Sequence, residues 1–256
     1  MSVPSSSHIA QLNIGRLVAD PDDPRVRPFM EAIDRINGLG KRSPGFVWMM
    51  EGSGAPDTGI AHMTRAGAQL GEDGRLRFPR GLVEDMIAKA NKQIILCARD
   101  PRHDLILSGS RVHFGTAGAA VHMVDADGRS YRDSTLQDLH DAARIVDGLD
   151  NIHFLQRPMV ARDIPDPCEM ELNTVYACCA GTRKHVGTSF SEPAHVAPAL
   201  ELLHLIAGGE KLWRERPFVS NSNCFVVPPM RFASESCQVM EACIEGGIPV
   251  LLLSAG

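Results

Sequence analysis

Hydrophobic positions follow two alternating patterns from about residue 60 to the end of the chain. Short apolar runs typical of buried strands are separated by segments in which apolar residues recur at helical spacing. Segment 134–149 opens on a Ser-Thr pair suited to a helix N-cap, and segment 234–247 ends on two glycines. Segment 248–256 is almost continuously apolar, as parallel strands buried on both faces are. Strands that alternate with helices predict parallel β-α-β units.

Five segments have the composition of strands in a parallel barrel. They are 111–116, 152–157, 173–180, 218–224 and 249–255. A closed barrel of alternating strands and helices has eight strands in about 250 residues. Five strands therefore predict part of such a barrel. The fold class that we expect is α/β, a partial TIM barrel with an N-terminal α/β extension.

The beginning of the chain differs from the rest. It predicts a strand, a helix and a second strand at 8–17, 26–39 and 43–50. Segment 51–59, rich in Gly, Pro and Ser, predicts a junction. The opening resembles the start of a family of uncharacterised ferredoxin-like α/β-barrel proteins. We therefore expect an extension over residues 1–55 and the barrel-type domain over 56–256.

Composition narrows the classes of function. Lys and Arg number 26 against 31 Asp and Glu, which gives a net charge of -5. This balance is not that of a nucleic-acid-binding protein, so we expect no nucleic-acid partner. No apolar run reaches the ~18 residues that cross a bilayer, so we expect no membrane insertion. The seven cysteines are odd in number and lie mostly in apolar segments, which favours buried thiols in a reducing cytoplasm.

A polar segment follows the predicted strand 173–180. This segment, 181–190, contains Lys184 and His185, which we expect at the carboxyl ends of the strands, where barrel enzymes place their chemistry. The two residues offer a cation and an imidazole that titrates near neutrality. An ordinary solvated loop explains the same residues equally well.

Two other predicted strands also end on polar groups. Asn221 and Asn223 lie near the end of an apolar strand, and strand alternation points both to the same side. Arg157 ends another strand just before Pro158, where its guanidinium could hold a carboxylate or pack across the mouth. Turn chemistry accounts for part of the polar residues after residue 218.

The cysteines give a weaker indication of metal chemistry. Cys178 and Cys179 are adjacent, and neighbours on a strand point to opposite faces. A zinc site would draw on Cys168, one of that pair, Cys224 and His185. Buried structural thiols are the alternative interpretation.

Seven separated segments carry a resemblance to a known family. They are ARDP (98–101), 105–114, DADGRSYRDSTLQD (125–138), LDNIHFLQRPMVARDIP (149–165), TRKHV (182–186), GGEKLWRERPFVS (208–220) and EGGIPVLLLSAG (245–256). In this order they resemble the trimethylamine methyltransferase family from about residue 60 to the end. The resemblance implies a TIM barrel that transfers a methyl group from a methylated amine, trimethylamine or a betaine, to the cobalt of a separate corrinoid protein.

The site implied by this resemblance holds a tertiary or quaternary amine, for which aromatic faces are suited. The aromatic candidates in or beside predicted strands are Phe114, Phe154, Tyr176 and Phe225. The expected substrate-binding residues are Phe114, Phe154, Arg157, Tyr176, Lys184, His185, Asn221 and Asn223. The corrinoid (cobalamin) cofactor is expected on the partner protein, with no metal bound by this chain.

The chain departs from the family in two ways. It lacks the later strands, and its first 55 residues do not match the family's opening. We therefore expect little or no methyl transfer from this polypeptide alone. Two other functions fit the pattern: an unrelated TIM-barrel enzyme, such as a zinc-dependent thiol methyltransferase, and a non-catalytic half-barrel that acts by association. Because an open sheet leaves unpaired edges, we expect a homo-oligomer.

Overall fold

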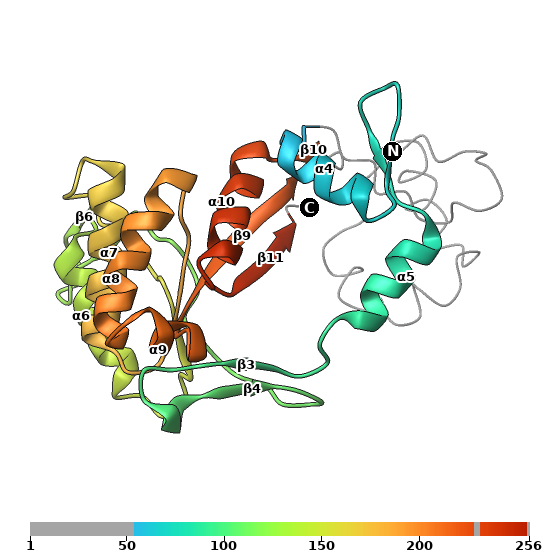
Figure 1. Cartoon of the computed structure of the whole chain (residues 1–256). Coiled ribbons are helices and arrows are strands. Elements are labelled where there is room, and N and C mark those ends of the chain that lie inside the picture. Colours follow the sequence, from blue (N-terminus) through green and yellow to red (C-terminus); the bar gives the residue numbers. More distant parts are fainter. Residues whose placement is uncertain (1–53, 228–230, 255–256) are drawn as a thin grey trace, which may run out of the picture. The chain divides into compact units, whose positions relative to one another are not determined.

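The computed structural model describes residues 54–227 and 231–254 and shows a mixed α/β arrangement around a parallel sheet. The parallel strands of this sheet follow one another in chain order (Figure 1). They are β7 (Phe154–Gln156), β8 (His185–Thr188), β9 (Val219–Val227) and β11 (Val250–Ser254). β8 lies between β7 and β9, and β11 pairs with the opposite edge of β9. The prediction of parallel β-α-β units is confirmed.

Two further segments extend this sheet. β10 (Arg231–Phe232) pairs antiparallel with the end of β9. Residues 115–120 run parallel to the chain that begins with β7, through isolated bridges at Gly115 and Ala120. The strand expected over 111–116 is therefore reduced to a single bridge at Gly115.

Helices connect the parallel strands and cover one face of the sheet. They are α6 (Leu136–Asp147), α7 (Pro167–Gly181), α8 (Val196–Ala207), α9 (Glu210–Glu215) and α10 (Ser234–Glu245), with a 3-10 turn η2 (Pro193–His195) before α8. α6, α7 and α8 stand side by side (Figure 1). Leu155, Val186 and Val219 occupy one register level of three strands and are buried in the main core with these helices. Burying each such side chain contributes about 1.5–3 kcal/mol.

α6 shows how local sequence sets an element. The Thr135 hydroxyl accepts the backbone N–H of Asp138, and the Asp138 carboxylate accepts the backbone N–H of Thr135 in return. Leu139, Ala143 and Val146 are buried along one side of the helix. The predicted N-cap and the apolar face are both confirmed.

Shorter elements precede the sheet in the chain. They are α4 (Asp57–Arg65), the hairpin of β1 (Gln69–Leu70) and β2 (Leu76–Arg77), α5 (Arg80–Lys89), the hairpin of β3 (Ile94–Leu96) and β4 (Leu105–Leu107) around the 3-10 turn η1 (Pro101–His103), and the hairpin of β5 (His122–Val124) and β6 (Tyr131–Asp133). A second, smaller core joins Leu76 to Val226 and Phe232. Among the described residues no helix has both the length and the apolar character to cross a bilayer.

Two further predictions about secondary structure are wrong. Residues 173–180, expected as a strand, lie inside α7, which begins with an Asp166 N-cap and Pro167 in its first turn. Buried side chains occupy much of the circumference of α7, so its sequence is apolar without the one-sided period of a surface helix. The segment 181–190, expected as a loop, contains β8, whose four residues are all buried.

The described strands form an open sheet and do not close into a barrel. The coarse α/β class is therefore confirmed, and the partial TIM barrel stays a prediction. The division at residue 55 also stays a prediction, because residues 1–53 of the expected extension lie outside the described residues.

Candidate functional site

Strand register separates the predicted site residues along the sheet. Val186 of β8 lies opposite Val219 of β9, and Thr188 lies opposite Asn221. Lys184 precedes β8, whereas Asn223 lies beyond the last residue that pairs with β8. The two side chains therefore belong toward opposite ends of the strands. The prediction that both lie at the carboxyl ends is wrong, because residues 173–180 form part of a helix and Lys184 lies just before the first residue of β8.

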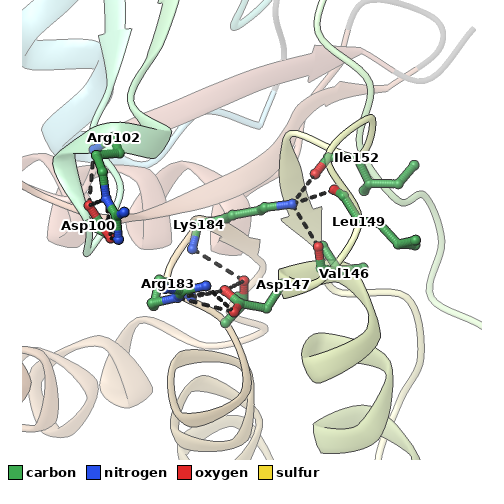
Figure 2. Close-up of polar contacts among 9 residues, drawn as sticks. Asp100, Arg102, Val146, Asp147, Leu149, Ile152, Arg183 and Lys184 are labelled. Carbon is green, nitrogen blue, oxygen red and sulfur yellow. Dashed lines mark hydrogen bonds and ion pairs between the residues drawn. The ribbon is translucent and has the colours of Figure 1, made fainter.

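Lys184 is a buried structural cation at the amino end of β8. Its ammonium nitrogen donates to the carbonyl oxygens of Val146, Leu149 and Ile152 at 2.7, 2.6 and 2.6 Å (Figure 2). Burial lowers the pKa of this lysine. An ammonium has three donors, and all three are used to hold the end of α6 and the loop after it.

Ion pairs surround Lys184 at this end of the sheet. The Arg183 guanidinium donates to the Asp147 carboxylate at 2.8 Å, and Arg102 pairs with Asp100 nearby (Figure 2). Although burial raises the pKa of Asp147, hydrogen bonds from Arg183 and Thr182 hold it below its ordinary value. The Arg183 and Lys184 contacts join the start of β8 to the end of α6 and the loop after it, and they engage the charges of Asp147 and Lys184 within the protein.

Both ring nitrogens of His185 are also engaged in hydrogen bonds within the protein. Its Nδ1 lies 2.6 Å from the Cys97 carbonyl oxygen, and its Nε2 lies 2.9 Å from the Ser220 hydroxyl. Burial lowers the pKa of this imidazole, which favours the neutral ring. The neutral ring donates from Nδ1 to the carbonyl and accepts the Ser220 hydroxyl at Nε2. His185 therefore joins the β3 hairpin to β9.

The aromatic candidates do not meet. Phe114 is 61% exposed, and its ring stacks on His153 with centroids 6.3 Å apart. Phe154 lies on β7 with its ring over Gly115, where an added Cβ would fall 2.3 Å from ring carbons. Tyr176 is 57% exposed on α7, because 173–180 is a helix. Phe225 packs against Phe232, with ring centroids 6.3 Å apart.

Asn221 and Asn223 point to the same side of β9, as predicted, but that side faces the helices. The Asn221 side-chain oxygen accepts the backbone N–H of Phe190 at 2.9 Å, and the Asn223 amide donates to the Ser236 carbonyl in α10 at 2.8 Å. Within the described residues the Asn221 Nδ2 and the Asn223 Oδ1 are buried without a hydrogen-bond partner.

Arg157 and Ser189 meet at the carboxyl ends of two neighbouring strands. Arg157 follows β7, and its backbone N–H donates to the Gly187 carbonyl at 2.8 Å, which extends the parallel ladder. Its guanidinium Nη2 donates to the Ser189 hydroxyl at 3.1 Å. Burial lowers the pKa of this guanidinium. Of the predicted polar residues, Arg157 is the one that the structure places at the expected end of the sheet with a charged group.

A second pair lies beside Arg157 and escaped the sequence analysis. The Glu171 carboxylate accepts the Ser191 backbone N–H at 2.8 Å and contacts Nδ1 of His195 at 2.8 Å. Glu171 and His195 are both buried. No local motif links a glutamate in an apolar helix with a histidine in the next 3-10 turn, so only the fold reveals the pair.

The face of the sheet opposite the helices is polar near Arg157. The Gln156 amide donates to the Ser222 hydroxyl at 3.2 Å, and the Gln156 carbonyl accepts the Thr116 hydroxyl at 2.5 Å. Gly187 lies under Gln156, because an added Cβ would fall 2.0 Å from Gln156 Oε1. We define the candidate site as Gln156, Arg157, Ser189 and Ser222, near the carboxyl ends of β7 and β8. Gln156 and Ser222 lie on the face away from the helices, whereas Arg157 lies on the helix side, near Glu171 of α7. These groups can bind and orient a polar or anionic ligand.

Metal ligation finds little support in this arrangement. Among the described residues no group of three or more His, Cys, Asp or Glu side chains is placed to hold a metal ion. Burial raises the pKa of the Cys178 and Cys179 thiols, that of Cys179 to about 12, which disfavours thiolates. Both nitrogens of His185 already have partners.

Two hollows lie at the amino end of the sheet rather than at the candidate site. The larger, of about 530 Å³, is lined in part by Arg99, Arg183, Arg216 and Phe218. The second, of about 430 Å³, is lined in part by Arg111, His113, His153 and Lys184. Of the predicted site residues, only Lys184 lines either hollow.

Comparison with known proteins places most of this chain in one family. Residues 55–256 match the model of the trimethylamine methyltransferase (MTTB) family, and residues 8–73 match a domain of unknown function, DUF3291. A trimethylamine methyltransferase of Desulfitobacterium hafniense is 30% identical over 181 residues, covering 71% of this chain and 36% of that protein. One from Methanosarcina mazei is 26% identical over 183 residues, covering 70% of this chain and 37% of that protein.

A relative with another printed substrate also matches. The glycine betaine methyltransferase of Desulfitobacterium hafniense is 26% identical over 192 residues, covering 74% of this chain and 39% of that protein. The chain thus spans less than half the length of these curated relatives. The match over 55–256 covers well over half of the chain, which therefore belongs to the trimethylamine methyltransferase family.

Proposed function

We propose that this chain serves in the transfer of a methyl group from a methylated amine, trimethylamine or a betaine, to a corrinoid protein. The family match over 55–256 carries this proposal. The printed names of the relatives, trimethylamine methyltransferase and glycine betaine methyltransferase, support the substrate class. The proposal includes the corrinoid protein as methyl acceptor and a location in the cytoplasm.

The order of the parallel segments supports a partial TIM barrel. Residues 115–120, β7, β8, β9 and β11 lie side by side in chain order and run in one direction. Barrels of this kind are built from such consecutive neighbours, with helices on the outer face. On this proposal the face that carries Gln156 and Ser222 is the inner face, and the helix-covered face is the outer one.

The residues of the chain would bind and orient the substrate at the carboxyl ends of the strands. The corrinoid of the partner supplies the cobalt nucleophile that accepts the methyl group. Gln156 and Ser222 offer hydrogen bonds on the inner face, and the Phe154 ring on that face is suited to a methylated ammonium group. Three of the predicted site residues have structural roles in this proposal. The polar atoms of Lys184 and His185 are all engaged in hydrogen bonds, and Tyr176 lies in the helix layer.

Two measurements on the purified chain test this function. Calorimetric titration with trimethylamine and with glycine betaine measures binding, and we expect at least one of them to bind. Methylation of free cob(I)alamin, followed by its absorbance, measures transfer, and we expect little or none because the chain spans 36–39% of its relatives. Absence of binding by both compounds would contradict the proposal.

A second candidate function is association of a non-catalytic half-barrel. One edge of β11 has no partner strand among the described residues, and its residues Leu251, Leu252 and Leu253 are 52%, 56% and 43% exposed. Apolar strand edges without charge or proline pair readily with other chains. Light scattering over a range of protein concentrations would show the concentration-dependent mass that this function requires.

A further inference from the structure

We propose that the larger hollow at the amino end of the sheet binds a small apolar molecule that carries one carboxylate, such as a medium-chain fatty acid. The hollow has a volume of about 530 Å³, which is typical of small-molecule sites. It is lined by residues around the start of η1, by the α8–α9 junction and by residues just before β8 and β9. This end of the strands is opposite to the candidate site, so the inference does not depend on the proposed function.

Two arginines that line the hollow are held in place by carboxylates that do not line it. Arg183, just before β8, donates to the Asp147 carboxylate at 2.8 Å (Figure 2). Arg216, just before β9, donates to the Asp104 carboxylate at 2.7 Å. These pairs fix both guanidinium groups and balance their charges. A guanidinium has five N–H donors, so each of the two keeps donors for a further acceptor.

Two acids that line the hollow are balanced in the same way. The Asp100 carboxylate accepts Nε of Arg102 at 3.0 Å, and the Glu215 carboxylate lies 3.9 Å from Nζ of Lys211. Neither Arg102 nor Lys211 lines the hollow. The two acids therefore leave no net charge at the hollow once these partners are counted.

Arg99 is the charged residue at the hollow that has no oppositely charged partner within the described residues. Its Nη1 donates to the Cys179 carbonyl near the end of α7, which is a neutral group. No carboxylate of the described residues lies within 4 Å of its guanidinium. Arg99 is exposed, so an anion can reach it without a rearrangement of the chain. The hollow thus carries one unbalanced positive charge, on a group whose planar fork matches a carboxylate.

The remaining residues give the hollow an apolar lining. Phe218 is buried and packs edge-on against Trp213, with ring centroids 5.4 Å apart. Ile206 of α8 and Leu212 of α9 also line the hollow, and Leu212 is 51% exposed. Covering apolar surface of this kind is favourable in proportion to its area. One positive charge beside an apolar lining fits a monoanion with an apolar body better than it fits an inorganic anion.

Three ligands test the inference on the 256-residue chain. Octanoate has the carboxylate and the apolar tail, 1-octanol has the tail alone, and acetate has the carboxylate alone. We expect calorimetry to show one octanoate bound per chain, about tenfold more tightly than 1-octanol, as for a charge-assisted hydrogen bond that is partly exposed. Acetate and inorganic phosphate should bind more weakly than octanoate, because neither covers the apolar lining.

Variants of Arg99 assign the difference between octanoate and 1-octanol to its charge. Arg99→Gln should lower octanoate affinity to that of 1-octanol and leave 1-octanol affinity unchanged. Arg99→Lys, which keeps the charge and loses the fork, should fall between the unaltered chain and Arg99→Gln. Arg144→Gln is the control, because the Arg144 side chain is 67% exposed on α6 and does not line the hollow.

A variant of Leu212 tests the apolar lining separately. Leu212→Gln should weaken octanoate and 1-octanol by a similar factor, about threefold to tenfold. Leu205→Gln is the control, because Leu205 is 80% exposed on α8 and does not line the hollow. Circular dichroism and thermal melting check that each variant folds.

Each outcome supports or overturns the inference. Failure of octanoate to bind, binding that does not saturate at one per chain, or equal affinities for octanoate and 1-octanol would overturn it. Equal losses of octanoate affinity in Arg99→Gln and Arg144→Gln would also overturn it, because the site would then lie elsewhere. Should Arg99→Gln not fold, Arg99→Lys and Leu212→Gln decide the question.

Discussion

The carboxylate of Glu171 and the imidazole of His195 meet in the buried layer between α7 and the start of α8, with Oε2 2.8 Å from Nδ1 across 24 residues of sequence. The other oxygen of Glu171 accepts the Ser191 N–H at 2.8 Å. The pair thus anchors the segment between β8 and α8, next to Arg157 and Ser189. This segment borders the candidate site, so the pair fixes the walls of the site as well as the core.

Removing Glu171 should strongly destabilise the fold. Glu171→Ala leaves the buried His195 nitrogen and the Ser191 N–H without an acceptor, which costs about 3 kcal/mol in the free energy of unfolding. Urea denaturation followed by circular dichroism measures this loss. Glu169→Ala is the control, because Glu169 is exposed on the same helix, and we expect a change within about 0.5 kcal/mol. Equal stability of the two variants would show that the buried pair contributes nothing.

Lys184 should prove essential to stability rather than to binding. Lys184→Met keeps the buried stem and removes the donors to three carbonyl oxygens, which should cost about 3 kcal/mol. Lys211→Met is the matched control, since the Lys211 side chain is 89% exposed and lies 3.9 Å from its nearest carboxylate. Chemical denaturation measures both variants. A large loss of ligand affinity in Lys184→Met at unchanged stability would instead support the binding role predicted from sequence.

The sequence predicted elements whose signals are local and missed those that depend on burial. α6 was predictable because its N-cap and one-sided apolar period lie within one segment. α7 was not, because Cys178 and Cys179 are both buried and the helix has no polar face of the usual width. β8 has the short, mixed sequence His-Val-Gly-Thr, and only its burial between two strands makes it part of the sheet.

Some residues of the candidate site could likewise be predicted from local sequence, and others could not. Arg157 was predictable because a charged residue directly follows an apolar strand, and that position does not depend on the neighbouring strands. Lys184 and His185 were placed at the wrong end because their position depended on whether 173–180 was a strand or a helix. The Glu171–His195 pair joins residues 24 apart and has no signature in either local segment.

Gly181 permits the close approach of α6 and α7. A Cβ at this position would lie 2.5 Å from the Ala143 Cβ and 2.9 Å from the His140 carbonyl oxygen. Gly181→Ala should therefore push the helices apart and cost about 1–3 kcal/mol. Gly148→Ala is the control, because the nearest atom to its added Cβ is 3.7 Å away. Thermal melting should show a lower midpoint for the first variant and little change for the second, and equal midpoints would contradict the close packing.

His185 should make stability fall on mild acidification. Burial lowers the pKa of its imidazole from the ordinary 6.5, outweighing the Cys97 carbonyl and Asp104, which raise it. The unfolded chain therefore takes up a proton at a higher pH than the folded chain does. Stability is complete above pH 6.5 and declines as the pH falls from there to the lower folded-state pKa. Urea denaturation between about pH 7.5 and pH 5 follows this range, in which histidine titrates.

A non-titrating variant isolates the contribution of His185 to that decline. His185→Asn should be less stable at neutral pH and should show a flatter dependence on pH over the same range. His62→Asn, at an exposed position on α4, should keep the slope of the unaltered chain. If His185→Asn has the same slope as the unaltered chain, the acid sensitivity arises elsewhere.

The open edge of β11 should govern self-association. Leu252 is 56% exposed on a strand that pairs with β9 on one side only among the described residues. Leu252→Lys places a charge on this edge, which opposes the approach of another strand and should lower the mass measured by light scattering at high protein concentration. Leu205→Lys is the matched control, because Leu205 is 80% exposed on α8 and takes no part in strand pairing. If both variants reduce association equally, the association arises from general surface hydrophobicity. If the unaltered chain is monomeric, the prediction that the β11 edge drives self-association is wrong.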